Sequence, residues 1–310
     1  MRTKQFKTLA EQIEILRSKG LVINDEAYAK EVLLKENYLF LTGYRHVFYR
    51  SPIDRRYIEG TTFEELYSLF VFDRNLRSIF FKNILIIENN LKSIVSYQLS
   101  KKYGYKEKYY MNPKNFNTEK YKMRQVNDVI HKMKRQIRIK SRQHLATMHY
   151  LENYGFIPLW VLVKVLSFGI ISELYSILKP EDQIAIAEYY DLDPNTLSVY
   201  LSMIANYRNL CAHEDILFQN KTQQMIGDTR YHLALNIPIT DDEYVYGKND
   251  LFALVIIMKA MLTDNEFSKM IHEISVELEL LDVNVSVIPI SKILDRMGFI
   301  ENWIDIAKIK

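Results

Sequence analysis

The feature that most constrains the fold is a helical pattern of apolar residues that runs from Thr62 to Gly104. Thr62 is a good N-cap, and Glu65 stands three residues later, as in a capping box. A helix of this length normally crosses a domain as its backbone. The chain also contains only 9 Gly and 7 Pro in 310 residues, which favours long helices with few breaks.

Helical periodicity continues on both sides of that segment. Asn24 is a good N-cap for a second helix, and Pro158, Pro180 and Pro194 each suit the first turn of another. The expected helices cover 7–20, 24–44, 62–104, 118–155, 158–178, 180–191, 194–214, 250–264 and 265–281, with a short helical end after 290. Segment 46–63 is expected to be a loop or a short hairpin, and 229–249 to be extended or irregular.

This order of elements predicts an all-α protein, a helical bundle with N-terminal and C-terminal helical extensions. We expect an N-terminal helical region at 1–60, a helical core at 61–220 and a C-terminal helical region at 221–310. Trp160 and the apolar run around it are expected in the core. Gly169, inside the same apolar segment, is expected to allow a close helix crossing.

Several classes of protein are disfavoured by composition. A single cysteine, Cys211, excludes an intramolecular disulfide and a cysteine-rich metal site. His131, His144 and His149 lack a carboxylate or cysteine at ligand spacing, and no glycine-rich phosphate loop is present. We therefore expect no metal and no cofactor.

The most apolar segment is interrupted by Lys164, Ser167 and Glu173, so no transmembrane span is expected. The N-terminal residues lack the apolar stretch of a signal peptide. The sequence predicts a soluble, cytoplasmic protein without a membrane partner.

The segment YRNLCAHEDILF, Tyr207–Phe218, places charged and polar groups at the end of an apolar helix. On a helical wheel the apolar stripe of that helix comprises Leu197, Leu201, Ile204 and Cys211. Arg208 falls inside this stripe, whereas Asn209 and His213 share a neighbouring face. An always-charged guanidinium on the core side must meet a carboxylate, a phosphate or a solvent-filled cleft.

Two interpretations of Arg208 and His213 remain open on the wheel alone. Arg208 can extend to the helix end and bond free carbonyls there, with His213 a simple helix-end residue. Alternatively, Arg208 holds a phosphate and stabilises its developing charge while His213 moves a proton. Such a pair suits metal-independent RNA cleavage, in which the 2′-hydroxyl attacks the adjacent phosphorus. Asn209 would then orient a hydroxyl or the histidine.

A second candidate feature is a strongly basic stretch between residues 120 and 142. Nine Lys and Arg stand there against Asp128 alone, a net charge of +8 in a chain whose total is +3. Such a stretch can follow an RNA backbone, although a solvated helix face is the commoner outcome. The expected RNA-binding residues in it are Lys132, Lys134, Arg135, Arg138, Lys140 and Arg142. The tyrosines just before it, from Tyr103 to Tyr110, can stack on bases or pack.

The segment RNLCAH resembles the R-(4–6 residues)-H motif of HEPN-domain ribonucleases, in the form with Asn directly after Arg. Over residues 20 to 220, four ordered segments also resemble the Abi family of AbiD/AbiF-like bacterial abortive-infection proteins. The segments are YLFLTGYRHVF, FDRNLRSIFFKNILIIENNLKS, PLWVLVKVLSFGIISELYSIL and YRNLCAHEDILF. Many members of that family carry HH or an arginine after the motif, where this chain reads HEDILFQN.

The resemblance implies an HEPN-type helical bundle that forms a homodimer and brings two Arg–His motifs into one composite cleft. It also implies a polar feature on an earlier helix, and ENNLK, with Glu88 and Lys92, fits its spacing. Glu88 would hold Arg208 in place. Lys92 would contact RNA, or only form a surface ion pair with Glu88.

The expected function is that of an abortive-infection toxin, a metal-independent endoribonuclease with Arg208, Asn209, His213 and Glu88 at its site. RNA would be the substrate and also a possible bound regulatory small RNA, and an antitoxin is a possible partner. One alternative is an RNA-binding protein that grips RNA without cutting it. Another is a structural dimer in which Arg208 only ties helices together.

Overall fold

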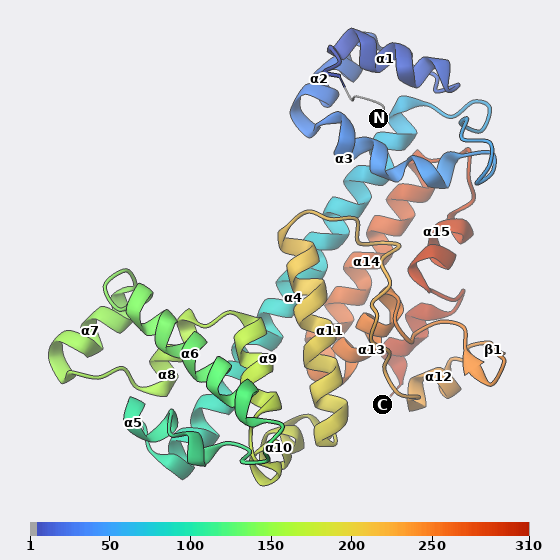
Figure 1. Cartoon of the computed structure of the whole chain (residues 1–310). Helices are drawn as coiled ribbons and strands as arrows, with labels where there is room; N and C mark the ends of the chain where they lie inside the picture. The colour runs from blue at the N-terminus through green and yellow to red at the C-terminus, as the bar shows by residue number, and fades with distance from the viewer. Residues whose placement is uncertain (1–4, 310) are drawn as a thin grey trace.

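The computed structural model describes residues 5–309 and confirms the predicted all-α class (Figure 1). Helix α4 (Phe63–Tyr103) is its longest element, and 41 residues at ~1.5 Å each make it about 60 Å long. The predicted capping box is present, because Thr62 and Glu65 each bond the other's backbone N–H. Gly104 ends the helix with φ 91°, a backbone conformation that residues with a Cβ rarely adopt.

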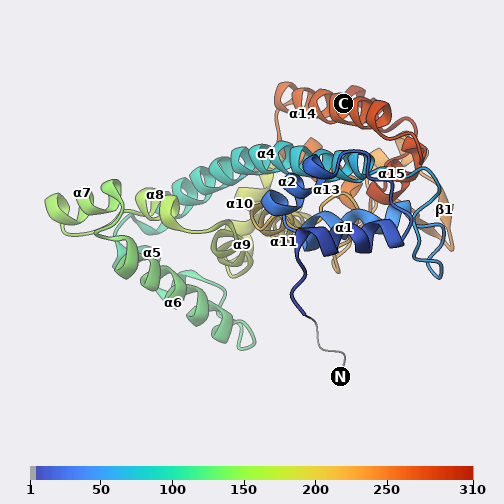
Figure 2. The same ribbon diagram turned by 90° about the horizontal axis from the view of Figure 1, so that it is seen from above.

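The remaining helices surround α4 along its length (Figures 1 and 2). At its N-terminal end lie α1 (Leu9–Ser18), α2 (Glu26–Glu36), α3 (Tyr38–Thr42) and the 3₁₀ helix η1 (Gly43–Phe48). Around its other end lie α5 (Glu107–Tyr110), η2 (Pro113–Asn115), α6 (Met123–Lys140), α7 (Leu145–Tyr154), α8 (Leu159–Leu162) and η3 (Val163–Val165). Next come α9 (Phe168–Ser176), α10 (Pro180–Ala187), η4 (Glu188–Tyr190) and α11 (Pro194–Ala212), and both α9 and α11 pack on α4.

The C-terminal region packs on α4 from another side (Figure 2). It contains α12 (Arg230–Ala234), α13 (Leu251–Met261), α14 (Asp264–Asn284), α15 (Ile290–Met297) and η5 (Trp303–Lys308). Helix α14 lies antiparallel to α4, since Lys82 pairs with Glu273 while Glu65 accepts hydrogen bonds from Ser286. The expected division at 60 and 220 stays a prediction, although α4 and α14 share one core across the second boundary.

Three segments expected as single helices are broken. The expected helix over 24–44 stops at Asn37, which has φ 67°, and α3 starts directly after it. The expected helix over 118–155 is divided by a turn, where the Thr147 hydroxyl donates to the carbonyls of Lys140 and His144. Side-chain hydrogen bonds of this kind compete with helix continuation.

The apolar segment 158–178 is also broken, because Ser167 caps α9 and Leu166 before it is extended. Two further expectations about this segment are wrong. Trp160 is 44% exposed, so it lies at the surface rather than in the core. A Cβ added at Gly169 would meet only the Ser167 hydroxyl at 4.0 Å, so no helix crosses closely there.

The irregular segments hold little regular structure. Strands β1 (Ile239–Thr240) and β2 (Glu243–Tyr244) pair antiparallel as a short hairpin between α12 and α13. In segment 46–63 one antiparallel bridge joins Tyr49 to Tyr57. Between residues 5 and 309, no helix is both long and apolar enough to cross a bilayer.

Candidate active site

Arg208 lies on the side of α11 that faces α4, as the helical wheel predicts. Its side chain is 30% exposed, and its guanidinium carbon lies 5.6 Å from the centre of the Phe81 ring. The Nε atom stands 4.0 Å from Oε2 of Glu88, close enough for an ion pair but too far for a hydrogen bond. Within the described part of the chain, the Arg208 guanidinium donates no hydrogen bond. It does not bond the carbonyls at its own helix end.

Glu88 and Lys92 lie side by side on α4, one helical turn apart. The Lys92 ammonium donates to Oε1 of Glu88 at 2.6 Å, and both side chains are largely buried. Because the pair is buried, it is not the surface ion pair that was the alternative for Lys92. The carboxylate therefore stands between two cations, Lys92 and Arg208, and its Oε2 atom accepts no hydrogen bond from the described residues.

Asn209 and His213 are both exposed, on the face next to Arg208. His213 is the residue directly after α11, and its backbone N–H bonds the carbonyl of Asn209 at 3.0 Å. Neither side chain hydrogen-bonds to Arg208 or Glu88 within the described residues. The structure thus brings Arg208, Glu88 and Lys92 together. His213 lies apart from them, exposed to solvent directly after the last residue of α11.

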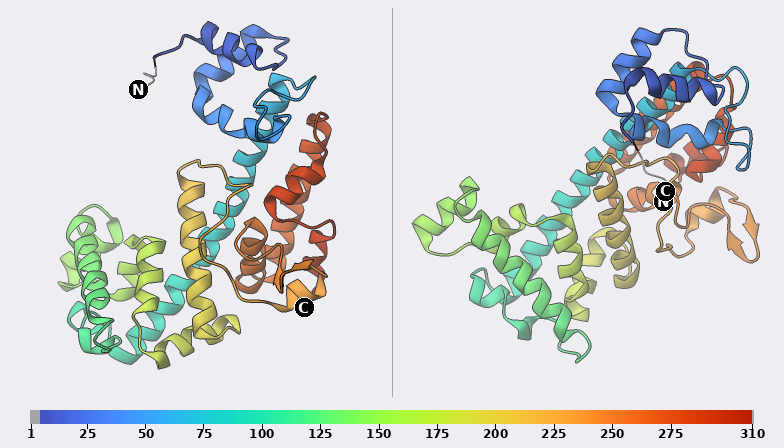
Figure 3. Two further views of the ribbon diagram at one scale, coloured as in Figure 1. Left: turned by 45° about the vertical axis from the view of Figure 1, so that its right-hand side comes forward. Right: turned by 45° about the horizontal axis from the view of Figure 1, so that its top comes forward.

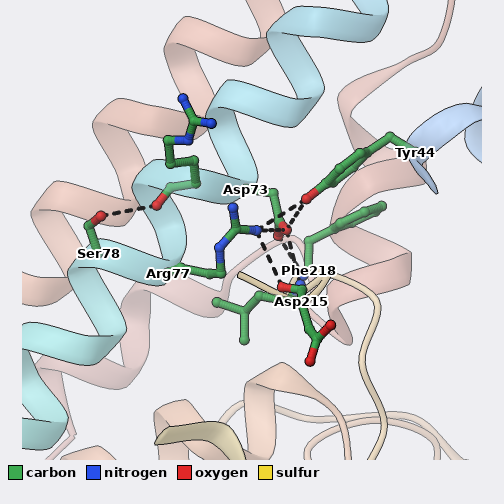
Figure 4. A network of polar contacts seen from close by, with 8 residues as sticks. Tyr44, Asp73, Arg77, Ser78, Asp215 and Phe218 are labelled. Carbon is green, nitrogen blue, oxygen red and sulfur yellow. Dashed lines mark hydrogen bonds and ion pairs between the residues drawn. The ribbon is translucent and has the colours of Figure 1, made fainter. Parts of the chain in front are cut away.

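The turn that carries His213 is anchored to α4 by a buried network (Figure 4). The Asp73 carboxylate accepts the backbone N–H groups of Leu217 at 3.0 Å and Phe218 at 2.8 Å. Arg77 pairs with Asp73 and also donates to the carbonyl of Asp215 at 3.3 Å, and the Tyr44 hydroxyl donates to Asp73 at 2.7 Å. The chain after His213 is therefore held in one position against α4.

Asp73 is fully buried, and its surroundings act on the pKa of its carboxyl in opposite directions. Burial raises the pKa of the Asp73 carboxyl, whereas the Arg77 guanidinium and the two backbone N–H donors oppose that rise. Asp73 and Arg77 were not among the expected site residues. Their spacing was a usable signal, because an acid and a base four residues apart both fall on the apolar face of this helix.

Cys211, in the last turn of α11, is not a reactive thiol. It is buried, and burial raises the pKa of its thiol to about 12. A thiol with that pKa is protonated near neutrality, so it does not supply a nucleophile. Among the described residues, no three His, Cys, Asp or Glu side chains form a group that could hold a metal ion.

The basic stretch contains the whole of α6, which packs on α9 and whose buried residues include Val126, Val129 and Met133. Helix α9 lies between α6 and α11, so the basic side chains do not stand next to Arg208 (Figure 3). Lys132 is paired with Glu173 at 2.5 Å. The exposed basic residues of this stretch are Lys120, Arg124, Lys132, Lys134, Arg135, Arg138 and Arg142, while Lys122 and Lys140 are partly buried.

The chain matches the model of the family described as Abi-like protein over residues 31–219. The matched region starts in α2, contains all of α4 and ends one residue after Phe218, so it contains the whole candidate site. No curated protein and no solved structure matches the chain. The match covers more than half of the chain, confirms the Abi part of the expected resemblance and supports a role in abortive infection. The chain belongs to the family of Abi-like proteins.

Proposed function

We propose that this protein is an abortive-infection toxin, an HEPN-type endoribonuclease that cleaves RNA without a metal ion. The observation that carries the proposal is the state of Arg208. A permanently charged, half-buried guanidinium faces a carboxylate at 4.0 Å and donates no hydrogen bond within the described residues. The Nε atom is buried, but the terminal Nη donors stay available to the non-bridging oxygens of a phosphate.

In this proposal each residue has a separate role. Arg208 binds the scissile phosphate and stabilises the charge that develops on it as the 2′-hydroxyl attacks. Glu88 keeps the guanidinium oriented, and the Lys92 ammonium holds that carboxylate in place. His213, exposed at the helix end, transfers a proton to or from the reacting oxygens, and Asn209 orients a hydroxyl or the imidazole.

The attack forms a bond between the 2′-oxygen and phosphorus and breaks the bond from phosphorus to the 5′-oxygen of the next nucleotide. The products are a 2′,3′-cyclic phosphate and a 5′-hydroxyl. The proton lost by the 2′-hydroxyl and the proton gained by the leaving oxygen balance, so no metal ion or other reactant is needed.

In a homodimer, the Arg208 guanidinium of the second chain could lie next to His213 of the first. Within one chain His213 forms no hydrogen bond to Arg208, and a composite cleft would bring the motifs of two chains together. Because the activity is toxic, we further propose that a bound small RNA or an antitoxin restrains it.

The test is incubation of the purified protein with total RNA in excess EDTA. We expect cleavage that disappears in Arg208→Ala and in His213→Ala, but persists in the matched exposed variants Arg55→Ala and His272→Ala. If the two motifs work across the dimer, mixing the two inactive variants restores part of the activity.

The rival function is RNA binding without cleavage, and the exposed basic residues of α6 favour it. The rival function is established if the wild-type protein binds intact RNA in a salt-sensitive way and cleaves it under no condition. RNA that is neither bound nor cut, together with unfolding of Arg208→Ala, makes Arg208 a structural residue only.

A further inference from the structure

Two adjoining cavities follow α4 beyond Lys92, between α4 and the α7–α8 segment. The first, about 480 Å³, is bordered by Lys92, His144 and Lys164. The second, about 450 Å³, is bordered by Tyr97, Lys101 and Tyr105. Both cavities share Ser93, Ser96 and Trp160, so they form one continuous depression, here named the α4 groove.

The α4 groove begins at the candidate active site. Lys92 borders it and bonds Glu88, whose second carboxylate oxygen lies 4.0 Å from Nε of Arg208. From Lys92 its residues recur every three or four positions to Lys101, which keeps them on one face of the helix. Glu88 to Lys101 spans about 20 Å at ~1.5 Å per residue. That length exceeds a single nucleotide and suits a short stretch of strand.

Large aromatic side chains stand exposed along this groove. Tyr97 is 59% exposed, Tyr105 is 45% exposed and Trp160 is 44% exposed. The Tyr105 and Trp160 rings lie 5.9 Å apart with planes tilted by 40°, and the Lys101 ammonium lies 5.9 Å from the Tyr97 ring centre. Exposed aromatic rings next to lysines are the usual platform for unpaired bases.

The groove is also positively charged. Lys101 and Lys164 are exposed at its border, whereas the charge of Lys92 is balanced by Glu88. No described residue that lines either cavity is an aspartate or glutamate. Ser93, Ser96 and Ser100 add hydroxyl groups that can bond phosphate or ribose oxygens. Two buried polar atoms at its walls, Nδ1 of His144 and Oγ of Ser100, have no partner among the described residues.

From this arrangement we infer that the α4 groove binds an unpaired stretch of RNA next to the scissile phosphate. Bases stack on Tyr97, Tyr105 and Trp160, and Lys101 and Lys164 neutralise the backbone. The inference rests on the proposed function, since it names the single-stranded part of that enzyme's substrate. Base-paired RNA is excluded because its bases already stack on one another and cannot reach the aromatic rings.

Binding is measured separately from cleavage, with a mixed-sequence oligonucleotide of about 12 nucleotides that carries 2′-O-methyl groups and therefore lacks the attacking hydroxyl. The protein has two tryptophans, and Trp303 is buried near the C-terminus. In Trp303→Phe, Trp160 is the sole tryptophan. We expect the single strand to quench its fluorescence, and a duplex of the same sequence to leave it unchanged.

If Trp303→Phe does not fold, fluorescence anisotropy of a labelled oligonucleotide on the wild-type protein gives the same information. Tyr97→Ala is expected to raise the Kd about tenfold, the usual effect of losing one stacked base. Tyr189→Ala, which removes a similarly exposed tyrosine outside the groove, is expected to leave the Kd unchanged.

Equal affinity for duplex and single strand, absence of quenching, or an unchanged Kd in Tyr97→Ala overturns the inference. So does binding of AMP as tight as that of the oligonucleotide, which would make the groove a nucleotide pocket. If the wild-type protein cleaves RNA but the groove tests fail, only the groove is wrong. If the single strand binds as expected but no RNA is cut, the proposed cleavage is wrong while the groove stands.

Discussion

At the scale of single residues, the candidate site depends on charges that α4 holds in place. Glu88 is shared by Lys92 and Arg208, and Asp73 is shared by Arg77, Tyr44 and two backbone N–H groups. Such carboxylates are costly to bury unless every partner is present. Removing one partner therefore leaves an unpaired charge inside the protein, and that unpaired charge dominates the free-energy cost.

Asp73→Asn is expected to destabilise the protein by about 3–5 kcal/mol, because it leaves the buried Arg77 guanidinium without a counter-charge. Urea denaturation followed by circular dichroism measures the change, with Asp128→Asn on the exposed face of α6 as the control. The double variant Asp73→Asn/Arg77→Met should recover much of the loss. A double variant no more stable than the single one would show that the buried charge is not the cause.

At the scale of helices, α4 is the element most readily predicted from sequence, and both of its ends lie where the pattern indicates. Its capping box and terminal glycine are local signals that need no tertiary contact. The breaks at Asn37 and Ser167 are not predicted, because no Pro or Gly marks them in the sequence. Both interrupt an apolar pattern that continues on the other side, and the break depends on side-chain bonds and packing rather than on Pro or Gly.

The same contrast applies to the candidate site. The helical wheel predicted that Arg208 lies on the core-facing side of its helix, and the family resemblance indicated Glu88, on an earlier helix, as its neighbour. The anchoring of the His213 turn by Asp73 could not be derived in that way. It joins residues 144 and 145 positions apart, and only the fold brings them together.

The contribution of Glu65, at the N-terminal end of α4, to the free energy of unfolding should depend on pH. Burial alone would raise the pKa of Glu65, but hydrogen bonds from the N–H groups of Thr62, Ser286 and Val287 outweigh it, and the pKa lies below 4.5. A lowered carboxyl pKa stabilises the fold above the unfolded value and ceases to do so as the pH falls through the folded value. Glu65→Gln should therefore cost roughly 2–3 kcal/mol at neutral pH.

The difference in unfolding free energy between wild type and Glu65→Gln, followed by urea denaturation as the pH is lowered, measures this effect. It should shrink as the pH falls below 4.5. Glu59→Gln, at an exposed position just before α4, should change stability by less than about 0.5 kcal/mol at every pH. A Glu65→Gln difference that does not vary with pH would contradict the assignment.

At the scale of the whole molecule, basic side chains occur in two separate places, the α4 groove and the exposed face of α6. The α4 groove starts at Lys92, whereas helix α6, which carries the exposed arginines, lies on the far side of α9 from α11 (Figure 3). An RNA that contacts both must extend over the α5–α8 region. This arrangement suits an RNA longer than the stretch that is cut, such as a structured small RNA.

The α6 surface is testable through salt dependence. Replacing Arg135, Arg138 and Arg142 by Gln should weaken RNA binding and reduce the slope of log Kd against log salt by about 0.7 for each lost phosphate contact. Neutralising Arg55, Lys269 and Lys308, three exposed residues elsewhere, is the matched control. Equal effects of the two triple variants would mean that α6 is an ordinary solvated helix face.

The central claim is that Arg208 and His213 cut RNA through its own 2′-hydroxyl. Mass spectrometry of the ends produced from a defined RNA in excess EDTA tests it most directly, with a second RNA that carries 2′-deoxyribose at the cut position. We predict a 2′,3′-cyclic phosphate and a 5′-hydroxyl from the first RNA, no cut at that position in the second, and no product with His213→Ala. A 5′-phosphate with a 3′-hydroxyl, or a cut that persists at the 2′-deoxy position, would contradict it.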